Sequence, residues 1–263
     1  MWVKQKCGFK NNPQWGVAVK YKFIIDKPSL DGQFVPLSET EKDIVIATVV
    51  GCYSLLLEGF QTERITKAIK LLRDYRKPFV TVYSDSTENE LIGEHHKDGV
   101  REGMVTEADG GYLYTEDLSS LPHGILSWIS TVMHNTWIKL CCMGRGTVTL
   151  PANFKLIAGT KMRIDDLCFN CIFDDCDIHY RCEEDESREV YSLNYLKEEI
   201  DKINRFYKDF GDDAIHFSNR AEASIPRCLY KDKTIRLAKT LATIKGHTLV
   251  MYDDLESAYK LTK

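Results

Sequence analysis

The sequence lacks the long apolar runs of membrane-spanning and secreted chains. A helix that crosses a bilayer needs roughly 18 or more consecutive apolar residues, and no such run occurs in the 263 residues, so we predict no membrane span. Residues 1–16 contain no apolar core of the kind found in signal peptides. We therefore expect no secretory signal.

An excess of positive charge is also missing. The formal net charge is −4 and the isoelectric point is about 6.0. Bulk electrostatics thus give no reason to expect nucleic acid or an anionic membrane as a partner. The basic stretch at residues 67–77 is better explained as the solvated face of a helix.

Cysteines are plentiful but have no secretory context. The chain has nine, an odd number, and without a signal they indicate reduced thiols in a cytoplasm instead of a disulfide framework. The sequence contains no internal repeat and no low-complexity segment. These features predict a globular cytoplasmic protein.

Hydrophobic patterning predicts strands that alternate with helices. Short apolar runs closed by turn residues are typical of buried parallel strands, and apolar residues three and four positions apart are typical of amphipathic helices. We predict strands at 53–59, 78–84, 110–117 and 154–160, a hairpin strand at 146–151, and helices at 39–50, 62–77 and 121–134. This order favours an α/β fold with a parallel sheet flanked by helices.

The pattern changes after about residue 186, where the remaining segments read as helices only. The chain is therefore predicted to divide into an α/β core at 1–186, with residues 1–33 as an N-terminal extension, and a small helical domain at 187–263. The join is expected in the acidic stretch at 182–191.

Several segments, in this order, resemble AAA+ ATPases of the magnesium chelatase group, including its I and D subunits, competence-type proteins and MoxR-type relatives. They are "FVPLSETEK" (34–42), "TENELIG" (87–93), "VREGMVTEADGGYLYTEDL" (100–118), "GTVTLPANFKLIAG" (146–159), "FDDCDIHY" (173–180) and the tail from Ser224 to Leu261. The resemblance implies an AAA+ P-loop-type core followed by a small C-terminal helical lid domain. Together the motifs cover roughly residues 34–260.

The resemblance places the family's phosphate-binding loop at "GFQTERIT" (59–66). The family pattern G-x-x-x-x-G-K-[ST] uses glycines for close backbone approach to phosphates and a lysine to neutralise their charge. Gly59 and Thr66 match the pattern. Arg64 replaces the second glycine and Ile65 replaces the lysine. The sequence predicts a loop that keeps its fold and has lost its ligand, with Gly59, Arg64 and Thr66 as the remaining nucleotide-binding candidates.

The magnesium-binding segment of the family corresponds to Glu116 and Asp117, the catalytic candidates of this chain. Glu116 would hold Mg²⁺ directly or through water, and Asp117 would replace a glutamate as general base. The alternative is that both acids cap the following helix, whose first turn favours negative charge. Both interpretations stay open on sequence alone.

Three further family positions bear on ATP hydrolysis. The residue expected to position the attacking water aligns with Lys161, or with Thr160 if the register slips, and Asp175 stands where the family has an arginine finger. A carboxylate at that position repels a nucleotide instead of stabilising its transition state. Only Arg227 matches the lid arginine that would contact the γ-phosphate.

Four cysteines have a spacing that invites comparison with a zinc site. Cys168, Cys171, Cys176 and Cys182 form C-x2-C-x4-C-x5-C. However, 176–182 aligns with a strand, which would hold Cys176 and Cys182 about 20 Å apart, too far to share a metal. We interpret these cysteines as buried free thiols, do not expect zinc, and assign no metal ligand among them.

The resemblance thus predicts a degenerate magnesium chelatase-like AAA+ module, a non-hydrolysing or weakly hydrolysing subunit or scaffold. It implies ATP or ADP with Mg²⁺ as cofactor, if any, and partners among other AAA+ subunits in a homo- or hetero-oligomer. Residues 135–151 resemble a family hairpin that meets a protein partner or substrate. The alternatives are an active atypical ATPase that uses Glu116 and Asp117 in remodelling or metal chelation, and a nucleotide sensor that binds without cleaving.

Overall fold

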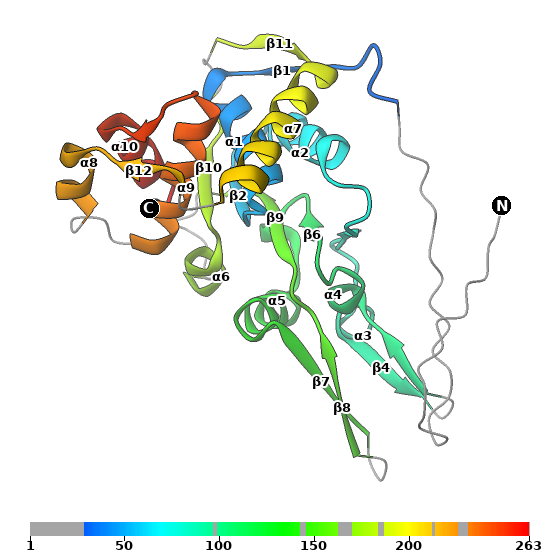
Figure 1. The fold of residues 1–263 in the computed structure, drawn as a ribbon. Helices are drawn as coiled ribbons and strands as arrows, with labels where there is room; N and C mark the ends of the chain where they lie inside the picture. The colour runs from blue at the N-terminus through cyan, green and yellow to red at the C-terminus, as the bar shows by residue number, and fades with distance from the viewer. Residues whose placement is uncertain are drawn as a thin grey trace.

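The computed structural model describes residues 29–96, 99–142, 146–162, 170–183, 187–211, 214–225 and 231–262 (Figure 1). At its centre is a five-stranded sheet in which every pairing is parallel, as the alternation of strands and helices predicted. In spatial order the strands are β10 (Ile178–Arg181), β2 (Leu55–Glu58), β9 (Lys155–Thr160), β6 (Tyr112–Thr115) and β3 (Phe79–Thr81).

Helices cover both faces of this sheet. Successive side chains of a strand point to opposite sides, and apolar residues on both sides are buried against helices. Leu55 and Leu57 of β2 join one apolar cluster, and Leu56 between them joins the other. The first cluster includes helices α1 (Glu39–Gly51), α2 (Glu63–Leu72), α7 (Leu193–Phe210) and α9 (Lys231–Ile244). The second includes α4 (Met104–Glu107), α5 (His123–Asn135) and α6 (Asn170–Asp175). The α/β class with a helix-flanked parallel sheet is therefore confirmed.

The strands and helices predicted before residue 186 lie where they were expected, except that one helix ends earlier than predicted. The predicted helix at 62–77 stops at Leu72, and residues 73–77 form a turn in which the Lys77 amide donates to the Asp74 carbonyl at 2.9 Å. Lys77 precedes Pro78, and the residue before a proline is disfavoured in a helix. The apolar spacing itself ends at Leu72, where α2 stops, so the prediction extended too far over the polar residues 73–77.

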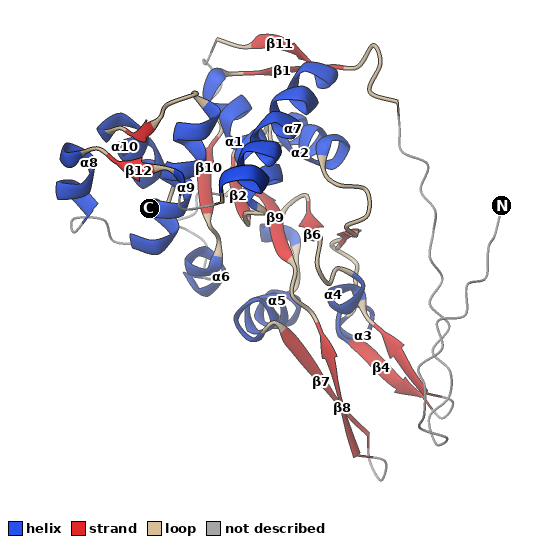
Figure 2. Cartoon of the chain, in the orientation of Figure 1, coloured by secondary structure: helices blue, strands red, loops and turns tan. Residues whose placement is uncertain are grey.

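Residues after 186 are not helices only, which corrects the prediction. β11 (Glu189–Ser192) pairs antiparallel with β1 (Phe34–Leu37), and β12 (His216–Phe217) pairs with β13 (Leu249–Val250). The helices α7, α8 (Asn219–Ser224), α9 and α10 (Tyr252–Leu261) make up the rest of the described residues there (Figure 2). These short strands are held by partners far away in the chain, so local pattern does not reveal them.

Two hairpins extend from the same side of the sheet (Figure 1). β7 (Trp137–Cys142) pairs with β8 (Gly146–Pro151), which confirms the predicted hairpin strand at 146–151. β4 (Gly93–His96) pairs with β5 (Gly99–Glu102) and follows the short helix α3 (Glu88–Ile92). The 3-10 turn η1 (Leu118–Ser120) connects β6 toward α5.

The helices after residue 186 pack on the sheet layer. Leu196 of α7 and Leu241 of α9 belong to the same buried cluster as Ile44 of α1 and Leu57 of β2. The described part of the core therefore crosses the boundary expected near 182–191, and the division into core and lid stays a prediction. None of the helices in the described ranges combines the length and apolarity that crossing a membrane requires.

Candidate functional site

The carboxyl ends of β2, β9 and β6 bring three predicted segments to one edge of the sheet. The Gly59 amide donates to the Thr160 carbonyl at 2.9 Å, which joins the end of β2 to the end of β9. A Cβ atom on Gly159 would lie 2.3 Å from the Glu116 carbonyl oxygen and 3.1 Å from Thr62 Oγ1. Only a glycine leaves room for this approach, so the loop after β2 and the acids after β6 meet over Gly159.

The loop between β2 and α2 has four residues, 59–62. Gly59 has φ +122°, a backbone conformation that favours glycine. Helix α2 then begins at Glu63, one residue before Arg64, so the second half of the segment 59–66 is helix. Ile65 is fully buried in the apolar core, and Thr66 Oγ1 donates to the Glu63 carbonyl at 3.0 Å. Neither side chain is directed into an open cradle for phosphate.

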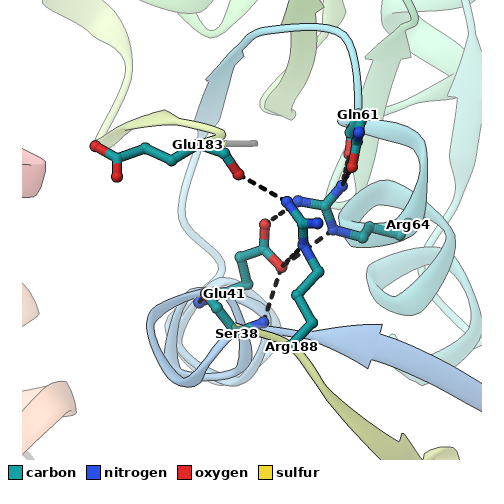
Figure 3. A network of polar contacts seen from close by, with 6 residues as sticks. All are labelled: Ser38, Glu41, Gln61, Arg64, Glu183 and Arg188. Carbon is teal, nitrogen blue, oxygen red and sulfur yellow. Dashed lines mark hydrogen bonds and ion pairs between the residues drawn. The ribbon is translucent and has the colours of Figure 1, made fainter. Parts of the chain in front are cut away.

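Arg64 is bonded on two sides (Figure 3). Its Nη1 donates to the Gln61 carbonyl at 2.7 Å and to Gln61 Oε1 at 2.9 Å, and so closes the loop on itself. Its Nε and Nη2 donate to the two carboxylate oxygens of Glu41, the former at 3.1 Å. Burial alone would lower the pKa of Arg64. The hydrogen bond and the negative charge of Glu41 outweigh this effect, so the pKa of Arg64 lies above its usual value. The cation at the phosphate-loop position is thus engaged by an internal carboxylate.

Glu41 is held in place by the start of α1. The helix begins with a capping box in which Ser38 Oγ accepts from the Glu41 amide at 3.2 Å and Glu41 Oε2 accepts from the Ser38 amide at 3.0 Å. The Glu41 side chain is fully buried. Arg188 also approaches Glu41, with Nε 4.0 Å from Glu41 Oε2 and Nη2 donating to the Glu183 carbonyl at 2.7 Å (Figure 3). Two guanidinium groups therefore converge on one buried carboxylate.

The two acids after β6 differ in environment. Asp117 caps η1, because its Oδ1 accepts from the Ser119 amide at 3.0 Å and from Ser119 Oγ at 2.6 Å. This matches the capping alternative for Asp117, although the capped element is a 3-10 turn instead of the helix. Glu116 is exposed at the same edge. Of the two predicted catalytic residues, only Glu116 presents an exposed side chain there.

The remaining predicted positions are separated. Thr160 is buried, its Oγ1 exchanging 3.2 Å hydrogen bonds with Met162, and Lys161 follows it on the surface. Asp175 is the last residue of α6 and precedes β10. Because β10 runs parallel to β2, Asp175 lies near the amino ends of the strands, whereas Gly59 lies at the carboxyl ends. Burial raises the pKa of the Asp175 carboxyl, an effect that His134 and Lys233 oppose. Arg227 lies outside the described residues.

Two of the four spaced cysteines can be placed. Cys176 precedes β10 and is buried, which raises the pKa of its thiol to about 12, and Cys182 follows the strand. β10 therefore lies between them. Cys168 and the side chain of Cys171 lie outside what the structure describes. Within the described residues, no group of three or more His, Cys, Asp or Glu side chains is arranged to hold a metal ion.

Sequence reasoning missed Glu41 and Arg188. The S-x-x-E pattern at 38–41 is a readable capping-box signal, and it places Glu41 at the third position of a helix. Nothing in that pattern says that the carboxylate would be buried against Arg64, 23 residues later. Arg188 gave no signal, because its approach to Glu41 depends on the pairing of β11 with β1.

Comparison with models of known protein families and with curated proteins finds no match to this chain.

Proposed function

We propose that this chain is a degenerate magnesium chelatase-like AAA+ module that neither binds nor hydrolyses nucleoside triphosphates efficiently. One observation carries the proposal: the guanidinium of Arg64, the residue aligned with the phosphate loop, is bonded to the carboxylate of Glu41. Supporting it, Ile65 is in the core and the loop is four residues long. The helix-flanked parallel sheet is compatible with a P-loop-type core.

The energetic argument concerns what a triphosphate would have to displace. For Arg64 to bind phosphate it must leave a fully buried carboxylate, and an uncompensated buried charge costs several kcal/mol. Phosphate binding at a strand–helix turn also uses backbone N–H groups that face the ligand. Here the Gln61 carbonyl oxygen of the loop instead accepts a hydrogen bond from Arg64 at 2.7 Å.

In this proposal the module acts as a structural subunit. Its partners are other AAA+ subunits of an oligomer in the cytoplasm, and its contribution is the shape of the α/β core with its two hairpins. The proposal predicts that the chain assembles with a catalytically active subunit and has no ATPase activity of its own.

A thermal shift with Mg·ATP and Mg·ADP at millimolar concentration tests this function. A ligand that binds only the folded state raises the melting temperature, so we expect no shift with either nucleotide. Inorganic triphosphate serves as a control for nonspecific anion effects. A shift with ATP that triphosphate does not reproduce would contradict the proposal, and binding without turnover would identify a nucleotide sensor.

A working atypical ATPase is the second candidate, favoured by the exposure of Glu116 beside Thr62 and Gly159. It requires Mg²⁺-dependent ATP turnover that the Glu116→Gln substitution abolishes. Ser119→Ala, which removes a hydroxyl bonded to Asp117, is a matched control at the same turn. Under our proposal, preparations of the wild type and of both variants show the same negligible phosphate release.

A further inference from the structure

A second group of reactive side chains lies at the opposite edge of the sheet. Cys52 ends α1 as its C-cap, with φ +48°, directly before β2. Lys77 lies in the turn after α2, before β3. The two residues are 25 positions apart, and Lys77 Nζ donates to Cys52 Sγ at 2.8 Å. This nitrogen–sulfur distance is as short as an ordinary N–H···O hydrogen bond, although sulfur is a larger atom than oxygen. Nitrogen and sulfur are therefore in direct contact.

The surroundings of this pair are rich in cations. Arg73 is 6% exposed, and its Nε has no hydrogen-bond partner in the described structure. Its guanidinium lies over the rings of Tyr75 and Phe79, at 4.7 Å and 5.0 Å from their centroids. The neighbouring Asp74 carboxylate is bonded to Arg76 at 2.8 Å. Within the described ranges, no carboxylate lies within ion-pair distance of Arg73 or Lys77, although the charge of Lys77 helps to lower the pKa of the Asp74 carboxyl.

Tyr112 places a phenol beside the thiol of Cys52 and near Arg73. Its hydroxyl donates to the Thr48 carbonyl at 3.1 Å and also makes a side-chain hydrogen bond with Cys52. Its phenol also interacts electrostatically with Arg73. The sulfur thus lies between an ammonium and a phenol, near a buried guanidinium. Cys52 is also half-exposed, so a small oxidant can reach its sulfur.

We propose that Cys52 and Lys77 form an oxidation-sensitive pair that closes a covalent nitrogen–oxygen–sulfur bridge when a peroxide is present. In the first step the Cys52 sulfur attacks hydrogen peroxide, the O–O bond breaks, and sulfenic acid and one water form. In the second step a further peroxide removes two electrons and the N–O bond forms. The sulfenic oxygen then joins Lys77 Nζ, and two more waters and one proton from the ammonium leave.

The contact distance is the physical reason for the second step. Reacting atoms held in van der Waals contact need no diffusive encounter, and one inserted oxygen can join nitrogen to sulfur without moving the backbone. The bridge would tie the end of α1, at the entry to β2, to the turn before β3. It would enclose β2, the four-residue loop and α2 in one covalent ring.

Peroxide treatment followed by mass spectrometry of the full chain and its proteolytic peptides tests the proposal. We expect a cross-linked peptide pair containing Cys52 and Lys77 that has gained one oxygen and lost two hydrogens. A thiol reductant should reverse it. Cys141, an exposed cysteine that contacts only the Thr147 hydroxyl at 3.7 Å within the described residues, is the internal control and should give no such product.

Lys77→Arg separates the covalent step from the electrostatic effect, because it keeps a cation near the thiol and removes the amine. We expect this variant to oxidise at Cys52 without forming the bridge. In the wild type, peroxide should raise the melting temperature, since a cross-link restricts the unfolded chain, and Lys77→Arg should abolish that rise. Cys52 that stays reduced, or that stops at sulfenic or higher acids in the wild type, would overturn the proposal.

Discussion

At the residue scale, one buried carboxylate explains the chemistry of the candidate site. Glu41 satisfies two needs at once: it completes the capping box of α1 and it neutralises Arg64. A buried charge is tolerated only when it is paired and hydrogen-bonded, and here the Ser38 amide and Arg64 supply both. The loop after β2 is therefore tied to the start of α1 by an internal ion pair.

Arg64→Met should reveal this dependence. The substitution keeps an apolar stem and removes the guanidinium, which leaves Glu41 buried with Arg188 Nε at 4.0 Å as its remaining cation. We expect a loss of about 3 kcal/mol in the free energy of unfolding, measured with urea. Arg76→Met is the matched control: its ion pair with Asp74 is exposed, and its removal should cost less than about 1 kcal/mol. Equal small losses in both variants would contradict the role of Glu41.

Asp43 predicts an unusual pH dependence. Burial raises the pKa of its carboxyl from 3.8 to about 6, despite the nearby Lys42. The folded state therefore binds a proton at Asp43 more tightly than the unfolded chain does. This contribution to stability is present at low pH and is lost as the pH rises from about 4 to about 6.

Asp43→Asn should remove the loss of stability that the wild type shows as the pH rises, because asparagine does not ionise. At pH 7.5 we expect the variant to be more stable than the wild type by up to about 3 kcal/mol, because one pKa unit corresponds to about 1.4 kcal/mol. The difference between variant and wild type should decrease as the pH falls from 6 to 4. Urea denaturation across this range measures it. A difference that is independent of pH would show that Asp43 is ionised in the folded protein.

At the element scale, the site depends on how closely strand ends approach one another. β9 lies between β2 and β6, so the loop after β2 and the acids after β6 meet above it. Gly159 permits that meeting, because the Glu116 carbonyl and the Thr62 hydroxyl occupy the space of its missing side chain. The loop after β2 is short for the same reason: α2 begins at Glu63, directly beyond this contact.

Gly159→Ala should therefore disturb the sheet edge. Its Cβ would lie 2.3 Å from a backbone oxygen, so β6 and β9 must separate. We expect a loss of about 2–3 kcal/mol in unfolding free energy, the range for overpacked interiors. Gly110→Ala is the control, because Gly110 has φ +73° and no atom within 4 Å of the added carbon, so only the backbone cost of about 1 kcal/mol applies. Thermal denaturation of both variants separates crowding from backbone strain.

At the scale of the whole molecule, the described chain shares one large core on the α1 side of the sheet. Residues of β1, α1, α2, α7, α9 and α10 belong to the same apolar cluster. Elements that share a core lose their stability together. The helices after residue 186 are therefore expected to unfold with the sheet, whatever role they have as a lid.

Leu241→Ala tests this coupling. The side chain is 2% exposed in α9, and its truncation should cost about 3 kcal/mol. We expect a single calorimetric transition in the wild type and a downward shift of that whole transition in the variant. Phe210→Ala is the control, since Phe210 is 67% exposed at the end of α7 and its loss should be nearly neutral. Two transitions, with only one shifted by Leu241→Ala, would favour a separately folding lid.

Elements with strong local periodicity were predictable, and those held by distant partners were not. The strands at 53–59 and 154–160 and the helix at 39–50 carry their apolar pattern in consecutive residues. β11 and β13 are short and depend on pairing with β1 and β12. The end of α2 at Leu72 was also missed, because residues 73–77 are compatible with a helix and Pro78 is the first clear stop signal in the sequence.

The sequence by itself determined the α/β class and the parallel sheet, because each follows from the chemical identity or spacing of nearby residues. Only the tertiary structure decided which partners the side chains of the loop at 59–66 meet. The contact of Glu41 with Arg64, the approach of Arg188 and the contact of Lys77 with Cys52 join residues that the fold alone brings together. Burial then sets their energies, and no sequence pattern states which charges are removed from water.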